Sequence, residues 1–540
     1  MEIAIPHYVI SVARILVKEG FKAYLVAGAI RDTLLGIQPH DYDIATDALP
    51  DQLIKLFPKS IAVGAQFGTV VAVQQDPSGE NFTVEVTTLR NEEDYLQGRW
   101  PSKVTFVREL EQDLQRRDFT INAMALDLGE KGISYLLHDG VDETISLVHA
   151  HRYEFTLLDY FNGQNDLQQK IIRTVGNPIA RFTEDGLRPY RACRFASQLG
   201  FTIEPATFAA IKECLNVSQL VSTERVRDEF MKILMNSPKP SVGINLLYES
   251  GLLALFLPEL VATRGVTQDI GHAFDVYEHT LRTVDLAPDR VKLAALFHDI
   301  AKPQTSTNDG HFYGHDQLGA EMAETIMKRL RFSNTEIKNV SNLVRWHMFF
   351  YPYTAKELQE IALKEGKPLP ETASPAETGH HEEDIKAARF WSDSAVRRFI
   401  QRVGLENIED LFSLRIADAT SEPVSMWSPE EIVALQARIS KVLEEDNALK
   451  ISDLALDGTV LMQELNIPAG PLLGKILTYL LEQVVENPNL NNTATLLQLA
   501  QNYCSQEGMV HPTTQLSSES MQVPLEQDQP ARHTVPGQTE

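Results

Sequence analysis

Over roughly the first 125 residues, short runs with helical spacing of apolar side chains alternate with strand-like runs. The helical runs are Ile3–Val17, a helix opening at Asp32–Leu35, and DALPDQLIKLF at 47–57. The strand-like runs, separated by Gly, Pro and Asn turns, are Tyr24–Ala27, DYDIAT at 41–46, SIAVG at 60–64, GTVVAVQQ at 68–75 and FTVEVTTL at 82–89. This alternation predicts a small mixed sheet with helices packed on it.

From about residue 175 to about residue 503 the apolar pattern is almost wholly helical. Loop-forming residues interrupt it at Ser237–Pro240, Thr305–Tyr313 and Gly366–His381, and the last of these predicts a surface loop or insertion. Residues Gln506–Glu540 are rich in Gln, Ser, Thr, Pro and Glu with almost no large apolar side chains. Such a segment cannot bury enough surface to order itself, so a disordered tail is predicted.

The chain has 540 residues and a formal net charge of -25. That length predicts about two to four domains. The acidic balance argues against a non-specific nucleic-acid coat protein, because phosphate binding depends on Lys and Arg. It leaves room for a nucleic-acid enzyme with a local basic groove.

The N-terminal residues lack an uninterrupted apolar run with a basic flank, and no stretch approaches the length of a membrane span. We therefore expect neither a signal peptide nor a membrane anchor. Three cysteines, Cys193, Cys214 and Cys504, lie far apart in no metal-like spacing. This usage favours a reducing, cytoplasmic location.

Two aspartates one residue apart stand out in DYDIAT. In a strand, Asp41 and Asp43 point to the same face, where their charges repel unless a cation lies between them. Mg²⁺ suits such oxygen ligands, and Glu85 in FTVEV is a possible third ligand. The simpler alternative, that both aspartates are surface turn residues, stays open on this two-residue motif alone.

Basic residues follow in a matching arrangement. The backbone around Gly28 can approach a phosphate closely where the helix holding Arg31 begins. Downstream, DLQRRDFTINAMALD at 113–127 places two arginines before an apolar run. In EDGLRPYRACRF at 184–195 three arginines are spaced three apart on a helix, beside apolar residues, which favours a basic ridge over a solvated face.

The order G-x-x-R-D, D-x-D, R-R-D-F-T-I-N-A-M-A and E-D-x-x-R-x-x-R-x-x-R-F resembles the class II nucleotidyltransferases. These are the CCA-adding tRNA nucleotidyltransferases and the bacterial poly(A) polymerases. The resemblance covers about residues 20 to 260, and the combined motifs are far more specific than any one of them. It implies that the paired aspartates hold catalytic metal ions that activate an RNA 3′-hydroxyl for attack on a nucleotide α-phosphate.

Carried over residue by residue, the resemblance implies three roles for the other motif positions. Gly28, Arg31 and Arg117 would hold the triphosphate, Asp185 and Arg188 would read the base edge, and Arg191 and Arg194 would support the nucleotide.

The chain departs from the family pattern at two of these motifs. It has Ala27-Gly28 where the family usually has two glycines, and we expect one methyl group to be tolerated because the second glycine makes the closer approach. It has Gly186 where the family tends to have proline, with Pro189 after Arg188. Proline disfavours helical geometry in the residue before it, so the position of Arg188 becomes uncertain. A segment near 134–155 also looks inserted.

The helical half contains a second set of chemically suited residues. An adjacent His-Asp pair in LFHDIAKP is a poor choice for a core, because buried charge and imidazole cost free energy unless paired or liganded. With the other histidines and an aspartate it resembles the HD phosphohydrolase superfamily. The resemblance implies metal ligands at His279, His298, Asp299 and Asp418, with His315 and His347 extending the site or binding substrate phosphate.

Nitrogen and oxygen ligands at this HD site suit Mn²⁺, Fe²⁺, Co²⁺, Ni²⁺ or Zn²⁺. The alternative is an HD fold that has lost its chemistry and is kept for RNA docking. Further on, Pro468–Pro471 sets a turn before a helix carrying Lys475, which resembles the family's RNA-binding tail; a phosphate contact and a plain helix–helix turn explain it about equally well.

We therefore expect an α+β protein: a mixed-sheet nucleotidyltransferase head, an all-α neck, an HD-type helical domain and a helical tail. The expected ranges are 1–150 for the head, 151–260 for the neck, 261–425 for the HD domain, 426–505 for an RNA-binding tail and 506–540 for the disordered tail.

The expected function is template-independent addition of CCA to tRNA 3′ ends from CTP and ATP, with Mg²⁺ as cofactor and tRNA as partner. Three alternatives remain: a poly(A) polymerase, an enzyme that adds only CC or only A, and an HD phosphohydrolase whose N-terminal half recognises RNA. The oligomeric state, the HD metal and the role of the 366–381 loop are not fixed by the sequence.

Overall fold

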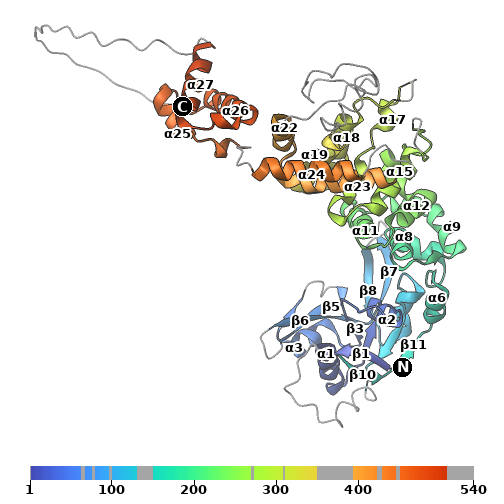
Figure 1. Cartoon of the computed structure of the whole chain (residues 1–540). Helices are drawn as coiled ribbons and strands as arrows, with labels where there is room; N and C mark the ends of the chain where they lie inside the picture. Colours follow the sequence, from blue (N-terminus) through green and yellow to red (C-terminus); the bar gives the residue numbers. More distant parts are fainter. Residues whose placement is uncertain are drawn as a thin grey trace, which may run out of the picture. The chain divides into compact units, whose positions relative to one another are not determined.

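The computed structural model describes residues 2–62, 67–75, 80–96, 100–129, 150–268, 273–307, 311–349, 393–421, 429–444 and 450–506 (Figure 1). The chain divides into two compact units: Met1–Ser392 with Phe399–Lys441, and Asp393–Arg398 with Val442–Glu540. The 366–381 loop, most of the inserted segment and nearly all of the expected disordered tail lie outside the described residues. The five-part domain division stays a prediction.

The chain begins with a strand and not with a helix. Strand β1 (Glu2–Pro6) pairs antiparallel with β10 (Ala150–Glu154), and helix α1 (His7–Lys18) starts only after Pro6. The expected helix over Ile3–Val17 is therefore wrong for its first residues, because Pro6 has extended backbone geometry at the N-cap position. The inserted segment thus ends in a strand that completes this two-stranded sheet.

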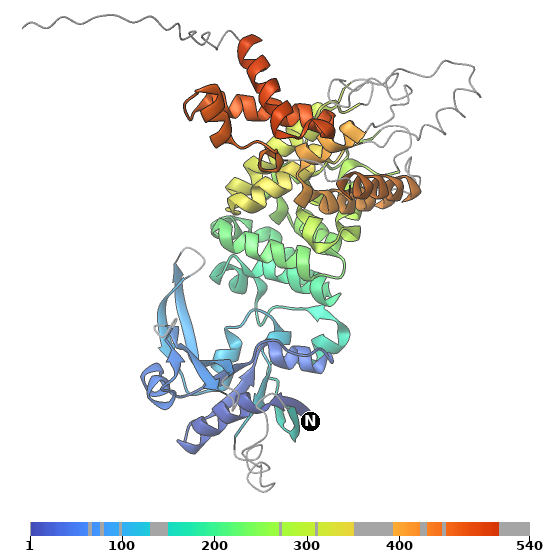
Figure 2. The same ribbon diagram turned by 60° about the vertical axis from the view of Figure 1, so that its left-hand side comes forward.

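The central sheet of the head has seven strands in the order β11-β9-β2-β3-β6-β5-β4. Only the β3–β6 pair is parallel; the other neighbours run antiparallel. The strands are β2 (Ala23–Val26), β3 (Asp43–Thr46), β4 (Ser60–Ile61), β5 (Thr69–Gln75), β6 (Asn81–Thr88), β9 (Ala125–Asp127) and β11 (Thr156–Leu158). The expected mixed sheet is confirmed, and the blue part of Figure 2 shows it from a second side.

Within the described part of the chain, four helices pack against this sheet. They are α1, α2 (Gly28–Leu34), α3 (Pro50–Leu56) and α4 (Leu110–Gln115). Buried Val26, Ala45 and Ala125 on the sheet pack with Leu110 and Leu114 of α4. Between β6 and α4 lies a hairpin that the sequence pattern does not predict, β7 (Arg90–Leu96) paired with β8 (Trp100–Phe106).

The expected neck range, 151–260, starts with residues of β10 and β11, which pair with the head strands β1 and β9. Beyond them it is helical, as expected, apart from one short parallel pair between β12 (Ile171–Ile172) and β13 (Thr202–Ile203). Its helices are α6 (Gly163–Gln169), α7 (Pro178–Glu184), α8 (Arg188–Leu199), α9 (Pro205–Glu213), α10 (Leu215–Ser218), α11 (Thr223–Asn236), α12 (Pro240–Ser250), α13 (Leu252–Phe256) and α14 (Pro258–Val261). Helix α8 packs against α11 and α12, so its side chains are held from two sides.

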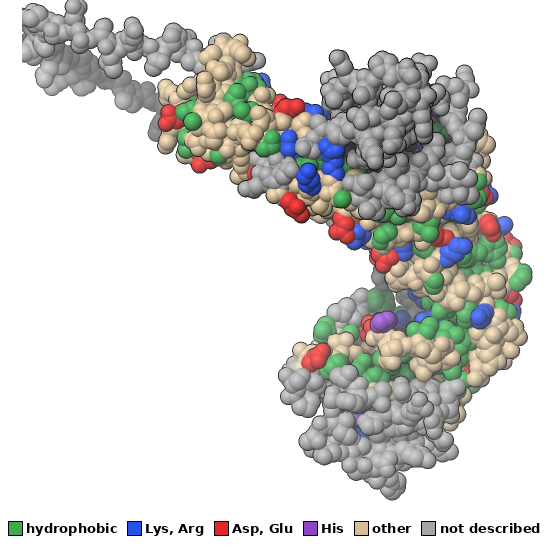
Figure 3. Space-filling view, viewed as in Figure 1, with side chains coloured by type: hydrophobic (Ala, Val, Ile, Leu, Met, Phe, Trp, Pro, Cys, Tyr) green, Lys and Arg blue, Asp and Glu red, His purple; other side chains and the backbone are tan. Residues whose placement is uncertain are grey.

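The following helices form the region expected to be HD-like. They are α15 (Val276–Leu286), α16 (Lys292–Phe297), α17 (Lys302–Thr305), α18 (His315–Arg329), α19 (Asn334–Trp346), α22 (Asp393–Val403) and α23 (Ile408–Ser421). Helix α24 (Pro429–Glu444) follows, in the range expected for the tail. Helix α15 packs against α16 and α23, which brings distant parts of the sequence together. On the face shown in Figure 3, acidic and basic side chains of the described helices are interspersed.

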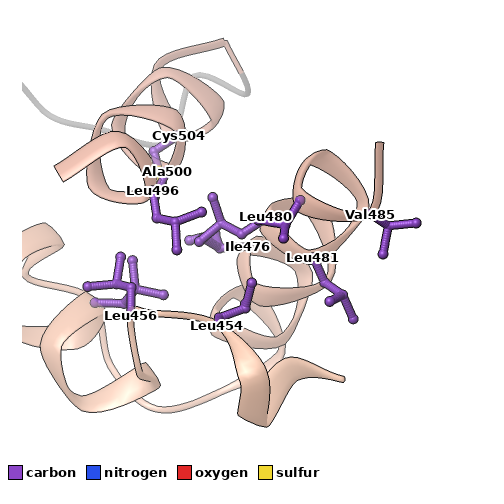
Figure 4. Close-up of a cluster of buried hydrophobic side chains, with 11 residues drawn as sticks. Leu454, Leu456, Ile476, Leu480, Leu481, Val485, Leu496, Ala500 and Cys504 are labelled. Carbon is purple, nitrogen blue, oxygen red and sulfur yellow. The ribbon is translucent and has the colours of Figure 1, made fainter. Parts of the chain in front are cut away.

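The second unit has a hydrophobic core of its own. Helices α25 (Gly458–Leu465), α26 (Pro471–Glu486) and α27 (Thr493–Gln506) surround a cluster that includes fully buried Ile476, Leu480 and Leu496 (Figure 4). Helix α26 begins at Pro471, as the turn before it predicts, and Lys475 is exposed in its second turn. Among the described residues, no helix is long and apolar enough to cross a membrane.

One backbone position in the head is strained. Ala27, the N-cap of α2, has φ 64° and ψ −132°, in a region that side chains other than glycine rarely adopt. A side chain held there costs of order 1–3 kcal/mol. The departure from two glycines is therefore tolerated at an energetic cost.

We expect Ala27→Gly to raise the free energy of unfolding by about 1 kcal/mol, because relief of strain exceeds the entropy that glycine adds to the unfolded chain. The matched control is Ala29→Gly, at a buried helical position two residues on, which should lower it by about 1 kcal/mol. Urea denaturation measures both. Equal destabilisation by the two glycines would show that Ala27 is unstrained.

Candidate functional site

Three carboxylates lie at or near the start of β3, where it pairs with β6. Asp43 begins β3 and lies in register with Glu85 on β6, while Asp41 is exposed just before the strand. Burial, together with the nearby Glu85 and Asp41 charges and against the opposing charge of Arg117, raises the pKa of Asp43 to about 6. Oxygen donors with unbalanced negative charge fit a hard divalent cation.

Arg31 of α2 is fixed by polar partners on two sides. Its guanidinium donates to Asp32 Oδ1 at 2.8 Å and to Asn122 Oδ1 at 2.8 Å. At Gly28, in the first turn of the same helix, an added Cβ would meet only Arg31 Nη2, at 3.6 Å. The space beside Gly28 is therefore not filled by the protein.

The Arg31 side chain is the first member of a chain of contacts that joins the head to the neck. Asn122 donates through Nδ2 to Asp118 Oδ1 at 3.2 Å, and Arg191 on α8 donates through Nε to Asp118 Oδ2 at 2.8 Å. Burial alone would raise the pKa of Asp118, but the Arg191 charge and the hydrogen bonds lower it to about 2. A buried, fully ionised carboxylate therefore holds Arg191 and, through Asn122, Arg31.

Arg117 is held by a second buried acid. Its Nη2 lies 3.1 Å from Asp113 Oδ2, and Arg116 Nη2 lies 2.7 Å from Asp113 Oδ1. Although burial would raise it, the two arginines together lower the pKa of Asp113. Arg117 also acts electrostatically on Asp43, so the structure brings this predicted phosphate ligand near the carboxylates.

The two residues expected to read the base have separate partners. Asp185 pairs with Arg225 of α11, with Arg225 Nη2 3.0 Å from Asp185 Oδ2. Arg188 is buried; it donates to Glu184 Oε2 at 2.6 Å and to the backbone carbonyls of Arg181 and Arg116, each at 2.9 Å. Arg225 has no signal in the sequence, because its pairing depends on how α11 packs against the α7–α8 loop.

The departures around this loop have a structural reason. Pro189 lies in the first turn of α8, where a missing backbone N–H costs nothing, so the helix simply begins at Arg188. A Cβ added at Gly186 would lie 2.5 Å from the Val217 carbonyl oxygen on α10. The close approach of the two backbones therefore excludes proline and every other side chain at position 186.

Arg194, one turn beyond Arg191 on α8, is also paired. Its Nε lies 2.5 Å from Glu229 Oε2, and its Nη1 donates to Gln198 Oε1 at 2.8 Å. The expected basic ridge is therefore a row of largely buried, neutralised arginines.

The six residues expected at the HD site come together in one buried cluster. They lie on or beside five helices: His279 on α15, His298 and Asp299 after α16, His315 at the start of α18, His347 after α19, and Asp418 on α23. Asp299 is central. His298 Nε2 lies 3.2 Å and His279 Nε2 3.5 Å from its Oδ2, and His315 Nε2 lies 3.5 Å and His347 Nε2 3.8 Å from its Oδ1. Asp418 Oδ1 lies 3.0 Å from His279 Nε2.

The imidazoles are oriented by their other ring nitrogens. Nδ1 of His298, His315 and His347 lies 2.8, 2.7 and 2.6 Å from the carbonyl oxygens of Ala295, Phe312 and Val344. A carbonyl only accepts, so Nδ1 carries the proton and Nε2 carries the lone pair in the neutral ring. In the same way His279 Nδ1 lies 2.9 Å from Ser421 Oγ. All four Nε2 atoms are therefore turned toward the same place.

The charge states also suit metal ligation. Burial lowers the pKa of His347 well below its usual value, and the nearby His315 and His298 lower it further. Burial alone would raise the pKa of Asp299, but His298 and Lys302 hold it well below its usual value. Nε2 of His315 and Nε2 of His347 are buried without a hydrogen-bond partner. Neutral imidazoles around an ionised carboxylate are the donor set that a transition metal requires.

The ligand atoms fall into two groups that share one carboxylate. His279, His298 and Asp299 form one group and Asp299, His315 and His347 form the other, and within each the ligand atoms lie within 4.8 Å of one another. Asp299 also lies 2.7 Å from the Lys302 ammonium, which in turn donates to Gln268 at 2.6 Å. Sequence reasoning does not single out this lysine, although it stands in the HDIAKP motif.

Comparisons with protein families cover most of the chain. Residues 23–173 match a model described as "Poly A polymerase head domain" and residues 200–263 one described as "Probable RNA and SrmB- binding site of polymerase A". Residues 269–421 match the HD domain, and residues 418–500 match a tRNA nucleotidyltransferase domain 2.

Similar proteins agree with these matches. A CCA-adding enzyme of Geobacillus sp. (strain WCH70) is 43% identical over 251 residues, which are 46% of this chain and 54% of that protein. In this and other curated relatives of comparable identity the match spans about half the relative's length. A CCA-adding enzyme of Lactococcus lactis is 29% identical over 89% of this chain and 93% of its own length.

Among solved structures, the Bacillus stearothermophilus CCA-adding enzyme in complex with CTP is similar, with a TM-score of 0.60 and 26% identity. The match covers 92% of this chain and 98% of that one.

The fold and the two ligand sets define a nucleotidyltransferase head joined through a helical neck to an HD domain, and the expected α+β class is confirmed. Domain by domain, the chain matches the poly A polymerase head, its RNA-binding region and an HD domain, and over most of its length it is similar to a CCA-adding enzyme. The roles of individual site residues stay predictions.

The raised pKa of Asp43 predicts a pH-dependent cost in the metal-free protein. Because the folded-state pKa of about 6 lies above the unfolded value, the ionised carboxylate destabilises the fold above pH 6. Asp43→Asn should therefore raise the free energy of unfolding by about 1–3 kcal/mol at pH 8, and the gain should shrink as the pH falls through 6 toward 4.

Urea denaturation in the presence of a chelator at pH 8 and pH 5 measures this difference. Asp41→Asn, at an exposed position, is the matched control and should give a much smaller gain. An Asp43→Asn gain that is the same at both pH values would contradict the assigned shift.

Proposed function

We propose that this chain adds the nucleotides C, C and A to the 3′ ends of tRNA, using CTP and ATP, at the carboxylates of Asp41 and Asp43. The observation that carries the proposal is the register of Asp43 on β3 with Glu85 on β6, two inner strands of the sheet, together with the electrostatic effect of Arg117 on Asp43. The names of the relatives support it: proteins similar over the head or over most of the chain are CCA-adding enzymes.

In this proposal Asp41 and Asp43 hold Mg²⁺, with Glu85 in position to help. A magnesium ion bound there supplies the positive charge that activates an RNA 3′-hydroxyl and stabilises pyrophosphate as it leaves. The arginines of the chain do the positioning. Arg31 and Arg117 bind the triphosphate, and their own acids, Asp32 and Asp113, keep them pointed before the substrate arrives.

Base selection is assigned to the loop between α7 and α8. Asp185 offers a carboxylate that can accept hydrogen bonds from an amino group on a base edge, which both cytosine and adenine carry. Arg188 can reach a base only if it gives up its hydrogen bond to Glu184 or to a backbone carbonyl. Asp185 is therefore the more accessible of the two residues assigned to the base. Arg191 and Arg194 support the nucleotide from α8.

The proposal is tested with purified protein, Mg²⁺ and three tRNAs, ending before CCA, after C and after CC, each given one nucleoside triphosphate at a time. We expect CTP to be used on the first two ends and ATP on the third. Asp43→Asn should reduce addition by about two orders of magnitude or more, because a charged metal ligand is lost. Asp51→Asn, an exposed acid on α3, is the control that should add normally.

The results also separate the alternatives. Repeated use of ATP on every end would indicate a poly(A) polymerase. Use of CTP alone, or of ATP only after CC, would indicate a CC-adding or an A-adding enzyme. Undiminished addition by Asp43→Asn would remove the metal assignment.

The buried histidine cluster favours a second activity, metal-dependent hydrolysis of a phosphate ester. His279, His298, Asp299 and Asp418 fit one transition-metal ion, and Asp299, His315 and His347 form a second group of candidate ligands. A metal held there activates water for attack on phosphorus. Lys302, 2.7 Å from Asp299, is placed to bind a negatively charged phosphate oxygen.

We expect His298→Ala and Asp299→Ala to lose bound transition metal, and hydrolysis of a 2′,3′-cyclic nucleotide with it, yet to keep nucleotide addition. Affinity for such a metal depends on ligand number and geometry, and these ligands are not shared with the head. His311→Ala, a histidine of the same region outside the cluster, is the control.

Elemental analysis and the two activity assays on each variant decide the outcome. Equal metal content in wild type and variants, with no hydrolysis in any, would mean that the cluster is a scaffold.

A further inference from the structure

Three arginines surround one phenylalanine ring at the junction of head and neck. The guanidinium carbons of Arg31, Arg191 and Arg194 lie 5.0, 5.3 and 3.9 Å from the centre of the Phe195 ring. Arg31 comes from α2 in the head, whereas the others come from α8, which also carries Phe195. Phe195 is only 5% exposed, so the contacts are largely shielded from water.

Three positive charges this close together repel one another unless nearby acidic or polar groups balance them. Each guanidinium has its own polar partner at its edge: Asp32 and Asn122 for Arg31, Asp118 for Arg191, Glu229 for Arg194. These hydrogen bonds lie in the plane of each guanidinium group and leave its flat faces available for contact with an aromatic ring. The negative face of an aromatic ring attracts a cation, more strongly when water is excluded.

The ring is itself held in place. Phe119, which is fully buried in the head, meets Phe195 edge to face, with centroids 5.8 Å apart and planes at 82°. Phe119 directly follows Asp118, the acid that binds Arg191. The Phe195 ring is therefore fixed by the same segment that fixes the arginine beside it.

We propose that Phe195 is a positioning residue for the nucleotide: its ring keeps Arg31, on the triphosphate side, at a set distance from Arg191 and Arg194, on the base side. The inference rests on the proposed function for the identity of the nucleotide. It assigns to one aromatic ring the task of joining triphosphate binding to base selection. The simpler account, that Phe195 only fills space in the core, makes a different prediction.

The electrostatics of the ring can be changed without changing its shape. Pentafluorophenylalanine at position 195 keeps the aromatic ring but withdraws the negative charge from its face. We expect this substitution to weaken binding of CTP and ATP roughly tenfold, and to lower the preference for CTP over UTP on tRNA ending before CCA, with little change in the unfolding temperature. Phe195→Leu should give the same loss of binding and a lower unfolding temperature.

Phe230→Leu is the matched control. Phe230 is a buried phenylalanine on α11 whose ring meets that of Phe256, with centroids 5.3 Å apart. It should lose stability to a similar extent and bind both nucleotides as the wild type does.

Nucleotide binding is measured by calorimetric titration with a non-hydrolysable CTP or ATP analogue, and selection by steady-state addition to tRNA. Normal binding and selection by the fluorinated variant would overturn the inference, whether or not the wild type adds CCA. Weakened nucleotide binding by the fluorinated variant, combined with a wild type that binds nucleotides but adds no CCA, would support the inference and contradict the proposed function. A wild type that binds neither nucleotide would overturn both.

Discussion

The ion pair between Asp118 and Arg191 is the interaction on which the arrangement of the nucleotidyltransferase half depends. It joins a segment of the head to helix α8 of the neck, at 2.5 Å between Arg191 Nη2 and Asp118 Oδ2. Removing one partner of a buried ion pair leaves the other charge uncompensated. The free energy lost in this way is much larger than the net stabilisation that the pair provides. Because Asp118 also binds Asn122, and Asn122 binds Arg31, one carboxylate sets the place of residues in both domains.

The arginines and the candidate metal ligands differ in how their charges are balanced. The arginines expected to meet the nucleotide are already neutralised inside the protein, so they are rigid before the substrate binds. Two other groups lack such a balance. The pKa of Asp43 is raised beside the neighbouring carboxylates, and the Nε2 atoms of His315 and His347 have no hydrogen-bond partner. The arginine side is thus preorganised by the protein alone, whereas in the proposed function the carboxylates and the histidine cluster are completed by bound cations.

The sequence predicts much of this, because strand and helix periods are local. The mixed sheet, the helical neck and the meeting of His279, His298, Asp299 and Asp418 follow from pattern and motif. Strand β1 and the β7–β8 hairpin do not follow from the sequence. The partner strand of β1 begins only at Ala150, and β7 consists mostly of polar residues. The Asp185–Arg225 pair and the arginines around Phe195 depend on how the helices pack, which the sequence pattern does not give. The need for glycine at position 186 likewise comes from the backbone of α10, which packs directly against it.

In the proposed function, one arrangement of buried charge selects CTP and ATP in a fixed order without a template. The most direct test of this selection is to sequence the 3′ ends of a tRNA lacking CCA after incubation of the wild-type protein with all four nucleoside triphosphates. The account predicts one dominant product that ends in CCA and grows no further. A ladder of added adenosines, or ends of mixed sequence, would contradict it.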